Sequence, residues 1–299
     1  MYSSLISFLK LNKIKYFKDF LGARLNYFEI GDNISLVIYP DTIKKLCILL
    51  KEIHKNKHKY YLLGNGTNVY ISENYKGIII STIKLQKTEV KEEFLDAYCG
   101  VSLSDVAFVA AYHGLTGLEF SFGIPGSVGG GVYMNASAYG GSVSNIVFKS
   151  LVYDTKEDEI YEIDKKAHGF DDKSSLFSKN KGIVALKTTF QLSYGEKDEI
   201  LSRMKDNLLK RIKTQPLEYG NGGSTFKRPK SNYASKMIDE CLLKGSFVND
   251  AMISNHHAGF IINRKNATAN DVTALIEKTK KSVYEKFKIE LEKEIILVE

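Results

Sequence analysis

A glycine-dense stretch at residues 114–141 limits what this chain can fold into more than any other segment. Its centre, Ile124-Pro-Gly-Ser-Val-Gly-Gly130, combines the fixed φ of Pro125 with several small residues, so main chain rather than side chains would line whatever lies against it. Long glycine-rich stretches in compact domains are usually functional or disordered, and the apolar and aromatic residues here favour order. The stretch therefore indicates either a main-chain surface for a large flat cofactor or a set of tight β-turns.

The length and composition of the chain indicate an ordinary globular protein of two or three domains. With 299 residues, 43% of them apolar and 26% charged, it can form substantial cores, which excludes a disordered, collagen-like or disulfide-scaffolded chain. No apolar run approaches the roughly 18 to 20 residues of a membrane helix. The N-terminus has no basic residue before its apolar part and no small-residue cleavage site, so we expect no signal peptide and a cytoplasmic protein.

Positive charge is concentrated in the last third of the chain. Residues 201–299 hold 18 Lys and Arg against 12 Asp and Glu, which accounts for +6 of the net charge of +7. Such asymmetry indicates an anionic partner or a solvated helix surface. Because acidic residues are interleaved with the basic ones and no nucleic-acid signature is present, a phosphorylated small molecule is favoured over nucleic acid.

Neither the cysteines nor the histidines form a metal-binding pattern. The cysteines are Cys47, Cys99 and Cys241. They are an odd number among apolar neighbours, so we expect inert core thiols. His54 and His58 have helical spacing without the Glu of a zinc protease, and the pair His256-His257 has no third ligand nearby. We therefore predict no metal.

Hydrophobic periodicity predicts a mixture of helices and strands. A strand at 36–39, a helix at 41–54 with Asp41 as its N-cap and a strand at 60–63 would form a small βαβ unit. The other expected elements are short strands at 77–81, 151–153 and 183–186, and helices at 104–113, 200–213 and 270–287. An α+β enzyme of two or three lobes follows from this pattern.

Two further glycine clusters are candidates for chemistry. In Leu63-Gly-Asn-Gly-Thr-Asn68 a tight turn follows a strand and could hold a phosphate, although an ordinary hairpin is the alternative and the dinucleotide-binding and Walker patterns are absent. In Gly222-Gly-Ser-Thr-Phe-Lys227 the hydroxyl of Ser224 could act as a nucleophile or as an acid. No nucleophile elbow of the Gly-x-Ser-x-Gly type supports the first alternative.

The spacing of these segments resembles that of the UDP-N-acetylenolpyruvoylglucosamine reductase (MurB) family, flavoenzymes that complete UDP-N-acetylmuramate for peptidoglycan. The matching segments follow the order of the family, span most of the chain and lack the longer insertions of some members, as in its compact subclass. They are Leu63–Asn68, Gly117–Phe120 through Gly140, Gly222–Lys227, His257–Asn263, Ala267–Ala269 with Asp271, and Leu291–Glu294.

The resemblance implies an α+β fold in which two lobes form an FAD-binding module of the vanillyl-alcohol-oxidase (PCMH) type and a third α+β lobe binds a UDP-sugar. The implied lobes are residues 1–76, 77–194 and 195–299, and the last strand would return to the flavin site. The implied FAD-binding residues are Gly64, Asn65, Gly66, Thr67, Asn68, Ile124, Pro125, Gly126, Ser127, Gly129, Gly130, Asn135, Ala136 and Gly140.

The chemistry of the family implies roles for residues that match its motifs. NADPH reduces the flavin, and hydride then reaches C3 of the enolpyruvyl ether and leaves negative charge at C2 and its carboxylate. Ser224 matches the family's proton donor to C2, and Glu294 matches the acid that helps to stabilise the intermediate. Lys227 and Arg228 would bind the UDP phosphates, and Tyr233 would contact the uridine side.

The chain departs from the family pattern at three places. Lys173, in Asp172-Lys-Ser-Ser175, stands where the family has an arginine at the intermediate's carboxylate, so the charge is kept without the planar fork. An early Gly-Gly-x-Ala element is reduced to Gly31-Asp-Asn-Ile34, and Asn249-Asp-Ala251 replaces a Gly-Gly-Ala. We expect His257 and Asn263 to shape the substrate lobe rather than to react.

The leading hypothesis is a monomeric, working reductase with bound FAD, NADPH as co-substrate and Ser224, Glu294 and Lys173 as catalytic residues. The second hypothesis is a catalytically impaired flavin-binding or UDP-sugar-binding homologue, motivated by Lys173 and by Gly31-Asp32. A basic nucleic-acid-binding protein is the third hypothesis, and it rests on the charge of residues 201–299 alone.

Overall fold

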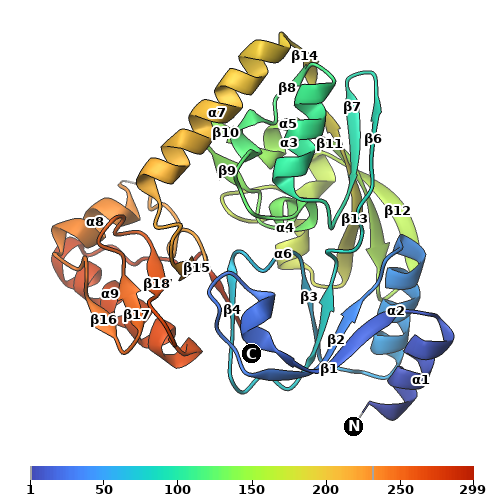
Figure 1. The fold of residues 1–299 in the computed structure, drawn as a ribbon, viewed down its shortest axis with the longest axis horizontal. Helices are drawn as coiled ribbons and strands as arrows, with labels where there is room; N and C mark the ends of the chain where they lie inside the picture. The colour runs from blue at the N-terminus through green and yellow to red at the C-terminus, as the bar shows by residue number, and fades with distance from the viewer. Residues whose placement is uncertain (1, 231) are drawn as a thin grey trace. The chain divides into compact units, whose positions relative to one another are not determined.

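The computed structural model of the chain describes residues 2–230 and 232–299 (Figure 1). The chain folds into two compact units. Unit 1 contains residues 1–18, 36–65 and 77–209, and unit 2 contains residues 19–35, 66–76 and 210–299. Over the described ranges, no helix is long and apolar enough to cross a membrane.

A four-stranded sheet forms the first part of unit 1. Its strand order is β1-β2-β5-β3, with β1 at Lys15–Leu21, β2 at Asn33–Tyr39, β5 at Ile78–Ser81 and β3 at Tyr60–Leu63. Both β2 and β3 run parallel to β5, and every residue of β5 is buried, as expected for a central parallel strand. The strands predicted at 36–39 and 60–63 are confirmed, but β5 lies between them, so they are not neighbours in the sheet.

Two helices share one core with this sheet. They are α1 at Ser3–Leu11 and α2 at Ile43–Lys55, both drawn in blue in Figure 1. Apolar residues three and four positions apart on each helix form the buried stripe that the periodicity of an amphipathic helix requires. The core includes Leu5, Leu9, Leu36, Ile38, Leu46, Leu49, Leu50, Ile53, Ile78 and Ile80.

The N-cap of α2 differs from the prediction by one residue. The hydroxyl of Thr42 accepts a hydrogen bond from the Lys45 N–H at 3.2 Å, so Thr42 is the cap. The predicted cap, Asp41, is wrong because its carboxylate instead pairs with the Lys45 ammonium at 2.9 Å.

The prediction of inert core thiols is confirmed for two cysteines. Cys47 and Cys99 are free and buried in the same core as α1 and α2. Burial raises the pKa of the Cys47 thiol to about 11 and that of the Cys99 thiol to about 12, so both stay protonated and unreactive near neutral pH. Cys241 is only half-buried, and burial also raises the pKa of its thiol.

A five-stranded antiparallel sheet forms the second part of unit 1. Its strand order is β12-β11-β13-β7-β6. These strands are β12 at Glu159–Asp164, β11 at Val147–Asp154, β13 at Ile183–Gln191, β7 at Phe94–Tyr98 and β6 at Thr88–Lys91. The predicted strands at 151–153 and 183–186 are confirmed as parts of β11 and β13.

The helices beside this sheet are short except for α3. They are α3 at Leu103–Tyr112, α4 at Val128–Tyr133, α5 at Val143–Ile146 and α6 at Leu176–Lys179. The hydroxyl of Ser102 caps α3, and the helix ends before Gly114, whose φ of +67° is the left-handed conformation expected after a helix C-terminus. The helix predicted at 104–113 is thereby confirmed with an offset of one residue.

Short elements complete unit 1. They are η2 at Glu119–Ser121, η3 at Lys166–His168, β8 at Leu115–Thr116 paired with β14 at Ser193–Tyr194, and β9 at Ser137–Ala138 paired with β10 at Gly141–Ser142.

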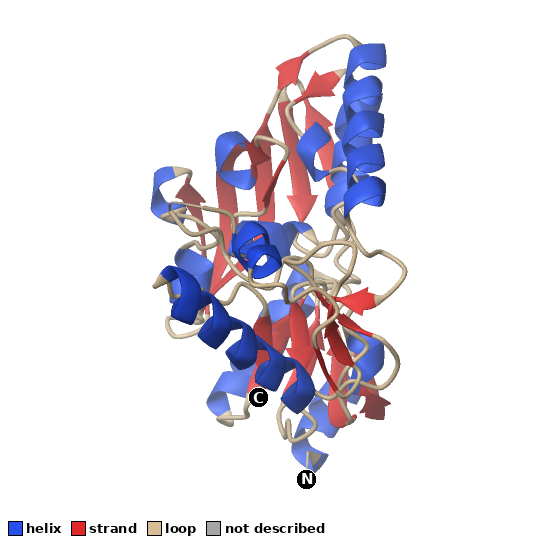
Figure 2. Cartoon of the chain, turned by 90° about the vertical axis from the view of Figure 1, so that its left-hand side faces the viewer, coloured by secondary structure: helices blue, strands red, loops and turns tan. Residues whose placement is uncertain are grey.

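Unit 2 is built around a small antiparallel sheet and two helices. The sheet has the order β15-β18-β17-β16, with β15 at Gly220–Asn221, β18 at Ile261–Asn263, β17 at Ala251–Ile253 and β16 at Phe247–Val248. The helices are α8 at Ala234–Glu240 and α9 at Ala269–Phe287, the long helix nearest the viewer in Figure 2. Two further strands, β4 at Val69–Ile71 and β19 at Ile296–Val298, pair in parallel, and η1 lies at Gly22–Leu25.

The start of α9 is fixed by a reciprocal cap. The Thr268 hydroxyl accepts from the Asp271 N–H at 3.1 Å, and the Asp271 carboxylate accepts from the Thr268 N–H at 2.9 Å. Apolar residues of α9, among them Leu275 and Ile276, share a core with Phe28 and Tyr70. The helix predicted at 270–287 is confirmed.

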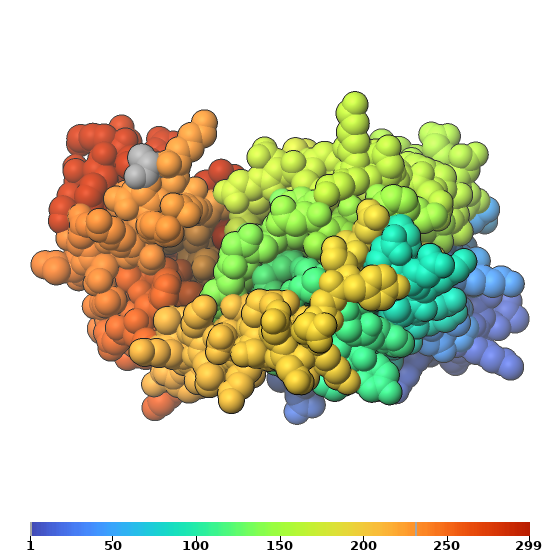
Figure 3. All heavy atoms as spheres, turned by 90° about the horizontal axis from the view of Figure 1, so that it is seen from above, coloured from blue at the N-terminus to red at the C-terminus, as the bar shows by residue number. Residues whose placement is uncertain are grey.

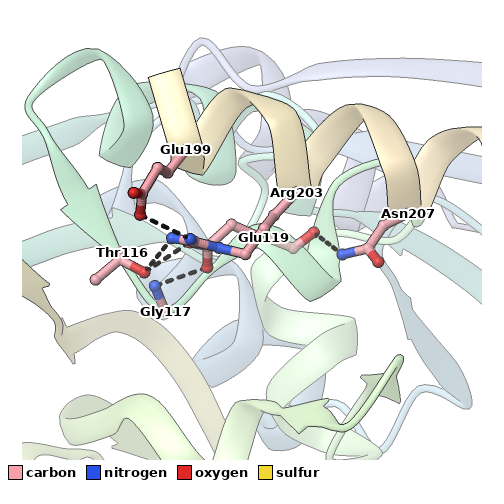
Figure 4. A network of polar contacts seen from close by, with 6 residues as sticks. All are labelled: Thr116, Gly117, Glu119, Glu199, Arg203 and Asn207. Carbon is pink, nitrogen blue, oxygen red and sulfur yellow. Dashed lines mark hydrogen bonds and ion pairs between the residues drawn. The ribbon is translucent and has the colours of Figure 1, made fainter. Parts of the chain in front are cut away.

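The long helix α7 at Lys197–Thr214 begins in unit 1 and is tied there by a buried carboxylate. Figure 3 shows residues of α7 in gold against the green segment that contains Thr116 and Glu119. Arg203 of α7 reaches the Glu119 carboxylate at 2.8 Å, and Thr116 donates to the same oxygen at 2.6 Å (Figure 4). Asn207 adds a bond to the Glu119 C=O at 3.1 Å. The helix predicted at 200–213 is thus confirmed, with one side of it anchored on unit 1.

Glu119 is ionised although it is only 8% exposed. Burial alone would raise the pKa of its carboxyl, but hydrogen bonds from Thr116, Arg203 and the Gly117 N–H outweigh burial and hold the pKa below its usual value of 4.5. A carboxyl whose pKa is lower in the folded state stabilises the fold above its ordinary pKa and loses that contribution as pH falls.

We predict that Glu119→Gln lowers the free energy of unfolding by about 1–3 kcal/mol at pH 7, because charge-assisted hydrogen bonds to α7 are lost. The difference between the wild type and this variant should shrink as pH falls below 4.5, as measured by urea unfolding across pH. Glu199→Gln is the matched control, since Glu199 contacts the same arginine at 3.6 Å but is 71% exposed, and its effect should stay below about 0.5 kcal/mol. Equal effects of the two substitutions would contradict the prediction.

Candidate active site

The turn at Gly64–Asn68, between β3 and β4, exposes a series of main-chain N–H groups. Over residues 2–230 and 232–299, none of its five amides donates a hydrogen bond to the protein. Gly66 has a φ of +67°, and a Cβ there would lie 2.1 Å from the Leu25 carbonyl oxygen, so only glycine fits. Successive unpartnered N–H groups in a turn form a concave site that attracts anions. The turn is therefore equipped to hold a phosphate.

Unit 1 brings the first two residues of this turn, Gly64 and Asn65, together with the predicted loop at 124–130. A Cβ on Gly64 would lie 2.2 Å from the Ser127 hydroxyl, and the Asn65 amide donates to the Pro125 carbonyl at 2.8 Å. Ser127 is the N-cap of α4, where its hydroxyl accepts from the Gly130 N–H at 3.3 Å. The two glycine segments thus approach each other through main chain and small side chains.

The predicted cofactor residues after α4 have clear structural roles. Ala136 is buried, and its N–H donates to the Gly131 carbonyl at 2.8 Å. Gly140 has a φ of +84° in the tight turn between β9 and β10. Asn135 accepts from the Ser144 N–H at 2.9 Å and donates to the Asp171 carbonyl at 3.1 Å. Whether these three residues also contact a cofactor stays a prediction.

Lys173 lies in a two-residue turn. Asp171 and Ser174 exchange main-chain hydrogen bonds of 3.0 and 3.3 Å, and Lys173 between them has a φ of +51°. Its half-buried side chain donates to the Ser137 hydroxyl at 3.2 Å. The turn therefore fixes the lysine next to the segment that contains the predicted cofactor residues Asn135 and Ala136.

A buried histidine that the sequence analysis did not identify lies just before this turn. His168 is fully buried, its Nδ1 donates to the Asp164 carbonyl at 2.7 Å, and its Nε2 accepts from the Ser150 hydroxyl at 2.9 Å. The Ser150 hydroxyl is also 2.9 Å from the Thr188 hydroxyl. Because Ser150 gives its own proton to His168, Thr188 is the donor in this second bond. Burial lowers the pKa of His168, so the ring stays neutral and this directional chain holds. A lone histidine in a polar segment carries no sequence signal for such a role.

In unit 2, Ser224 is presented by an unusual turn. Gly223 has a φ of +78°, and its N–H donates to the Asn221 side chain at 2.9 Å. A Cβ on Gly222 would lie 2.5 Å from the Phe28 ring, which explains the second glycine. Ser224 itself is exposed, and its hydroxyl has no hydrogen-bond partner within the described part of the chain. Asn221 was missed, although Asn before Gly-Gly is a typical turn signal.

Unit 2 places Glu294 beside the segment of Ser224. The Glu294 N–H donates to the Thr225 carbonyl at 2.9 Å, and the Lys227 N–H donates to the Glu292 carbonyl at 2.8 Å. Residues 225–227 and 292–294 therefore lie antiparallel to each other, with Phe226 opposite Lys293. The predicted proton donor and the predicted acid are thus brought close together, although 70 residues separate them in the sequence.

The predicted substrate residues form two pairs in unit 2. Lys227 makes an ion pair with the Glu292 carboxylate. The Arg228 guanidinium lies over the ring of Tyr233, 3.9 Å from its centre. Both Arg228 and Tyr233 are exposed, so each pair can be reached by a ligand from solvent.

Two residues expected to shape this unit do so. The His257 ring accepts from the Gly259 N–H at 3.1 Å and packs edge-on against Phe260, and burial lowers its pKa. Asn263 donates to the Phe28 carbonyl at 2.9 Å and accepts from the Ala267 N–H at 2.9 Å.

The structure also explains two departures from the family pattern. Asn249 has a φ of +47° in the turn from β16 to β17, a left-handed conformation that asparagine tolerates better than most residues, and its amide donates to Asp271 at 2.7 Å. Gly31 has a φ of +128°, and a Cβ on Gly22 would lie 2.6 Å from the Asp32 carbonyl oxygen. The segment at Asn249 therefore keeps a left-handed turn, and the segment at Gly31 keeps close main-chain packing.

Comparisons with known proteins agree with this geometry. Residues 34–159 match the family model of an FAD binding domain, and residues 215–298 match the model of the UDP-N-acetylenolpyruvoylglucosamine reductase C-terminal domain. The chain is similar to the UDP-N-acetylenolpyruvoylglucosamine reductase of Clostridium novyi, with 39% identity over 96% of this chain and 94% of that protein. It is also similar to reductase 2 of Bacillus anthracis, with 38% identity over 91% and 89% of the two chains.

Solved structures give the same result for the fold. The crystal structure of the UDP-N-acetylenolpyruvylglucosamine reductase from Thermus caldophilus superposes with a TM-score of 0.80 at 28% identity, over 96% of this chain and 99% of that one. An alkyldihydroxyacetonephosphate synthase, at 14% identity, 65% and 44% coverage and a TM-score of 0.50, shares the fold alone. The predicted α+β fold with an FAD-binding module of the vanillyl-alcohol-oxidase type is confirmed.

We predict that Gly64→Ala weakens binding of FAD, the ligand named by the matched family model, by about 10- to 100-fold. The new methyl group would lie 2.2 Å from the Ser127 hydroxyl and push the turn away from its loop. The measurement is FAD affinity by flavin fluorescence or by absorbance near 450 nm.

The double variant Gly64→Ala/Ser127→Ala provides the control, because the next atom, the Ser127 Cβ, is 3.4 Å from the added methyl. The double variant should regain most of the FAD affinity. Loss of the α4 cap should separately lower the free energy of unfolding by roughly 1 kcal/mol. If the double variant binds FAD no better than Gly64→Ala, the close approach at Gly64 is not the reason for the loss.

Proposed function

Since the chain belongs to the UDP-N-acetylenolpyruvoylglucosamine reductase family, we propose roles for its residues in the reaction of that family. The chain is an FAD-containing oxidoreductase that reduces UDP-N-acetylglucosamine-enolpyruvate to UDP-N-acetylmuramate in peptidoglycan synthesis, with NADPH as co-substrate. One observation carries the residue roles: the bond from the Glu294 N–H to the Thr225 carbonyl sets a carboxylate segment beside the exposed Ser224 hydroxyl.

The residues present fit FAD. The amides of Gly64–Asn68, unpartnered within the described chain, suit a pyrophosphate, and the small residues at Gly64 and Ser127 are proposed to let a flat ring lie against main chain. The Ile124–Gly130 loop and the Asn135–Gly140 segment are proposed as the rest of the cofactor wall. Bound FAD supplies the transfer of hydride from NADPH to C3 of the enolpyruvyl ether.

Ser224 is proposed as the proton donor to C2 of the substrate. A hydroxyl is a weak acid near neutral pH, but carbon that carries negative charge is basic enough to take its proton. The exposed position of Ser224 supports this role, because solvent can restore the proton after each turnover. Glu294 is proposed to stabilise the charge on the adjacent carboxylate through a hydrogen bond.

Lys173 is proposed as the cation that faces the developing negative charge. Its turn and its bond to Ser137 hold the ammonium in place. A fixed cation stabilises charge that develops in the transition state more than a mobile one, and this compensates in part for the missing guanidinium fork.

The UDP moiety is proposed to bind at Lys227, Arg228 and Tyr233. The guanidinium of Arg228 lies over the Tyr233 ring, and it can pair with a phosphate through two parallel hydrogen bonds. When the substrate binds, the Lys227 ammonium would leave the exposed Glu292 carboxylate and pair with a phosphate of the UDP moiety. The positive charge of residues 201–299 favours the approach of such a substrate.

The organisation of the protein is proposed on similar grounds. The two separate sheets of unit 1 support two FAD-binding lobes near the proposed bounds of 1–76 and 77–194, although β5 at Ile78–Ser81 belongs to the first sheet and residues 19–35 and 66–76 cluster with unit 2. The family model that begins at residue 215 supports a substrate lobe at 195–299. We propose a cytoplasmic monomer that acts on small molecules and does not bind nucleic acid specifically.

We predict that purified protein oxidises NADPH through repeated turnovers only when UDP-N-acetylglucosamine-enolpyruvate is present, as followed by absorbance at about 340 nm. Reduced flavin should accumulate without the sugar and return to the oxidised spectrum when it is added. Tight binding of the UDP-sugar without any NADPH oxidation would instead support the catalytically impaired homologue.

We predict that Ser224→Ala loses roughly 100- to 10,000-fold in turnover, the usual contribution of one general acid. Its flavin should still be reduced by NADPH at the rate of the wild type, because the hydroxyl acts only after hydride has left the flavin. Rapid-mixing experiments on each half-reaction make this comparison. A variant with unchanged turnover would show that the proton comes from another group.

A further inference from the structure

Asn68 connects the cofactor turn to Glu294 through its side chain. The Asn68 amide nitrogen donates to the main-chain carbonyl of Glu294 at 3.1 Å. The carbonyl of Asn68 accepts from the Ile296 N–H at 2.9 Å. Both residues belong to unit 2, and the first contact spans 226 residues of sequence. Asn68 therefore holds two successive parts of the segment that carries Glu294.

The other side of Glu294 is held by the Ser224 segment. The Glu294 N–H donates to the carbonyl of Thr225, which is 1% exposed. Thr225 is itself fixed, because its N–H donates to the Gly259 carbonyl at 2.9 Å and its hydroxyl accepts from the Ile261 N–H at 3.1 Å. The main chain of Glu294 is thus bonded through its N–H to the fixed Thr225 peptide and through its carbonyl to the Asn68 side chain.

The rigid pairing of β4 and β19 begins directly after Asn68. Val69 is opposite Ile296, and the parallel register continues to Ile71 and Val298. The ladder therefore places Asn68 directly beside the segment that carries Glu294. The Asn68 side-chain oxygen and main-chain N–H have no partner in the described residues, so both stay available to a ligand in the turn.

We propose that Asn68 is a positioning residue that couples occupancy of the cofactor turn to the placement of Glu294. This inference rests on the proposed role of Glu294 in the reaction. A cofactor that orders the turn also orders the side-chain amide of Asn68. This amide holds the Glu294 carbonyl and thereby fixes the main chain from which the Glu294 side chain extends. By linkage, an ordered Glu294 segment also favours the turn conformation that binds the cofactor.

Asn65 offers a matched control in the same turn. It is the same residue type three positions earlier, but its amide donates at 2.8 Å to the Pro125 carbonyl in unit 1 and not to the segment of Glu294. Removing either side chain deletes one amide-to-carbonyl bond of the turn. Only removal of Asn68 deletes the connection to Glu294.

The experiment compares Asn68→Ala and Asn65→Ala, each with and without Glu294→Gln, in the FAD-loaded enzyme. We expect Asn68→Ala to slow reoxidation of reduced flavin by the enolpyruvyl substrate by about 3- to 10-fold, the value of one hydrogen bond, while reduction by NADPH changes less than about 2-fold. In the Glu294→Gln background, Asn68→Ala should cause no further slowing. Asn65→Ala should keep its full effect on FAD affinity in both backgrounds.

Hydrogen exchange gives a measurement that does not depend on turnover. In wild-type protein, added FAD should slow amide exchange in residues 294–298, and in Asn68→Ala this protection should be lost while Asn65→Ala keeps it at saturating FAD. The same measurement on FAD-free protein applies if Asn68→Ala retains too little FAD for kinetics: exchange of residues 294–298 should then be faster than in the wild type.

The outcomes separate this inference from the proposed function. If Glu294→Gln reoxidises its flavin as fast as the wild type, the proposed role of Glu294 fails. If Glu294→Gln reoxidises its flavin slowly but adding Asn68→Ala slows it further, Asn68 does not act through Glu294 and the inference is overturned. The inference is also overturned if Asn68→Ala leaves hydrogen exchange of residues 294–298 unchanged.

Discussion

Main chain lies so close to a neighbouring segment at Gly64 that a single added carbon would overlap the Ser127 hydroxyl. The predicted cofactor surface depends on this approach, because it joins two glycine segments 60 residues apart into one wall without bulky side chains. Glycine costs conformational entropy on folding. The Asn65 bond to Pro125, the Ser127 cap of α4 and the surrounding cores offset that cost. The turn can then leave five amides unpartnered, since other groups hold it in shape.

In unit 2, the groups that hold the proposed site are separate from the side chains that are proposed to react. Thr225 is buried and fully bonded, whereas the preceding Ser224 is exposed with an unpartnered hydroxyl in the described chain. Glu294 is likewise fixed through its peptide groups by Thr225 and Asn68. Substitution of a reacting side chain can therefore change the chemistry while the main-chain frame stays intact.

Local sequence signals predicted the long helices, whereas pairing between distant segments could not be predicted. Helices α2, α3, α7 and α9 have clear periodicity, and their ends were predicted to within about three residues. The seven-residue α8 has no side-chain cap and is too short for periodicity, so it was missed. No local pattern indicates that β5 inserts between β2 and β3. Asp41 and Thr42 are both capping residue types, and the prediction overlooked that Asp41 can pair with Lys45 four residues on and leave the cap to Thr42. The site residues came from family motifs, but their partners, such as Glu292 for Lys227, depend on contacts between distant segments.

The parallel pair of β4 and β19 has a consequence for biosynthesis. Residues 69–71 leave the ribosome long before residues 296–298, their only ladder partner in the described chain. Until then, the second half of the Gly64–Asn68 turn lacks the strand and the Glu294 carbonyl that support it. The proposed flavin cradle is therefore incomplete in a nascent chain until residues 294–298 have been made, so stable cofactor uptake requires that segment.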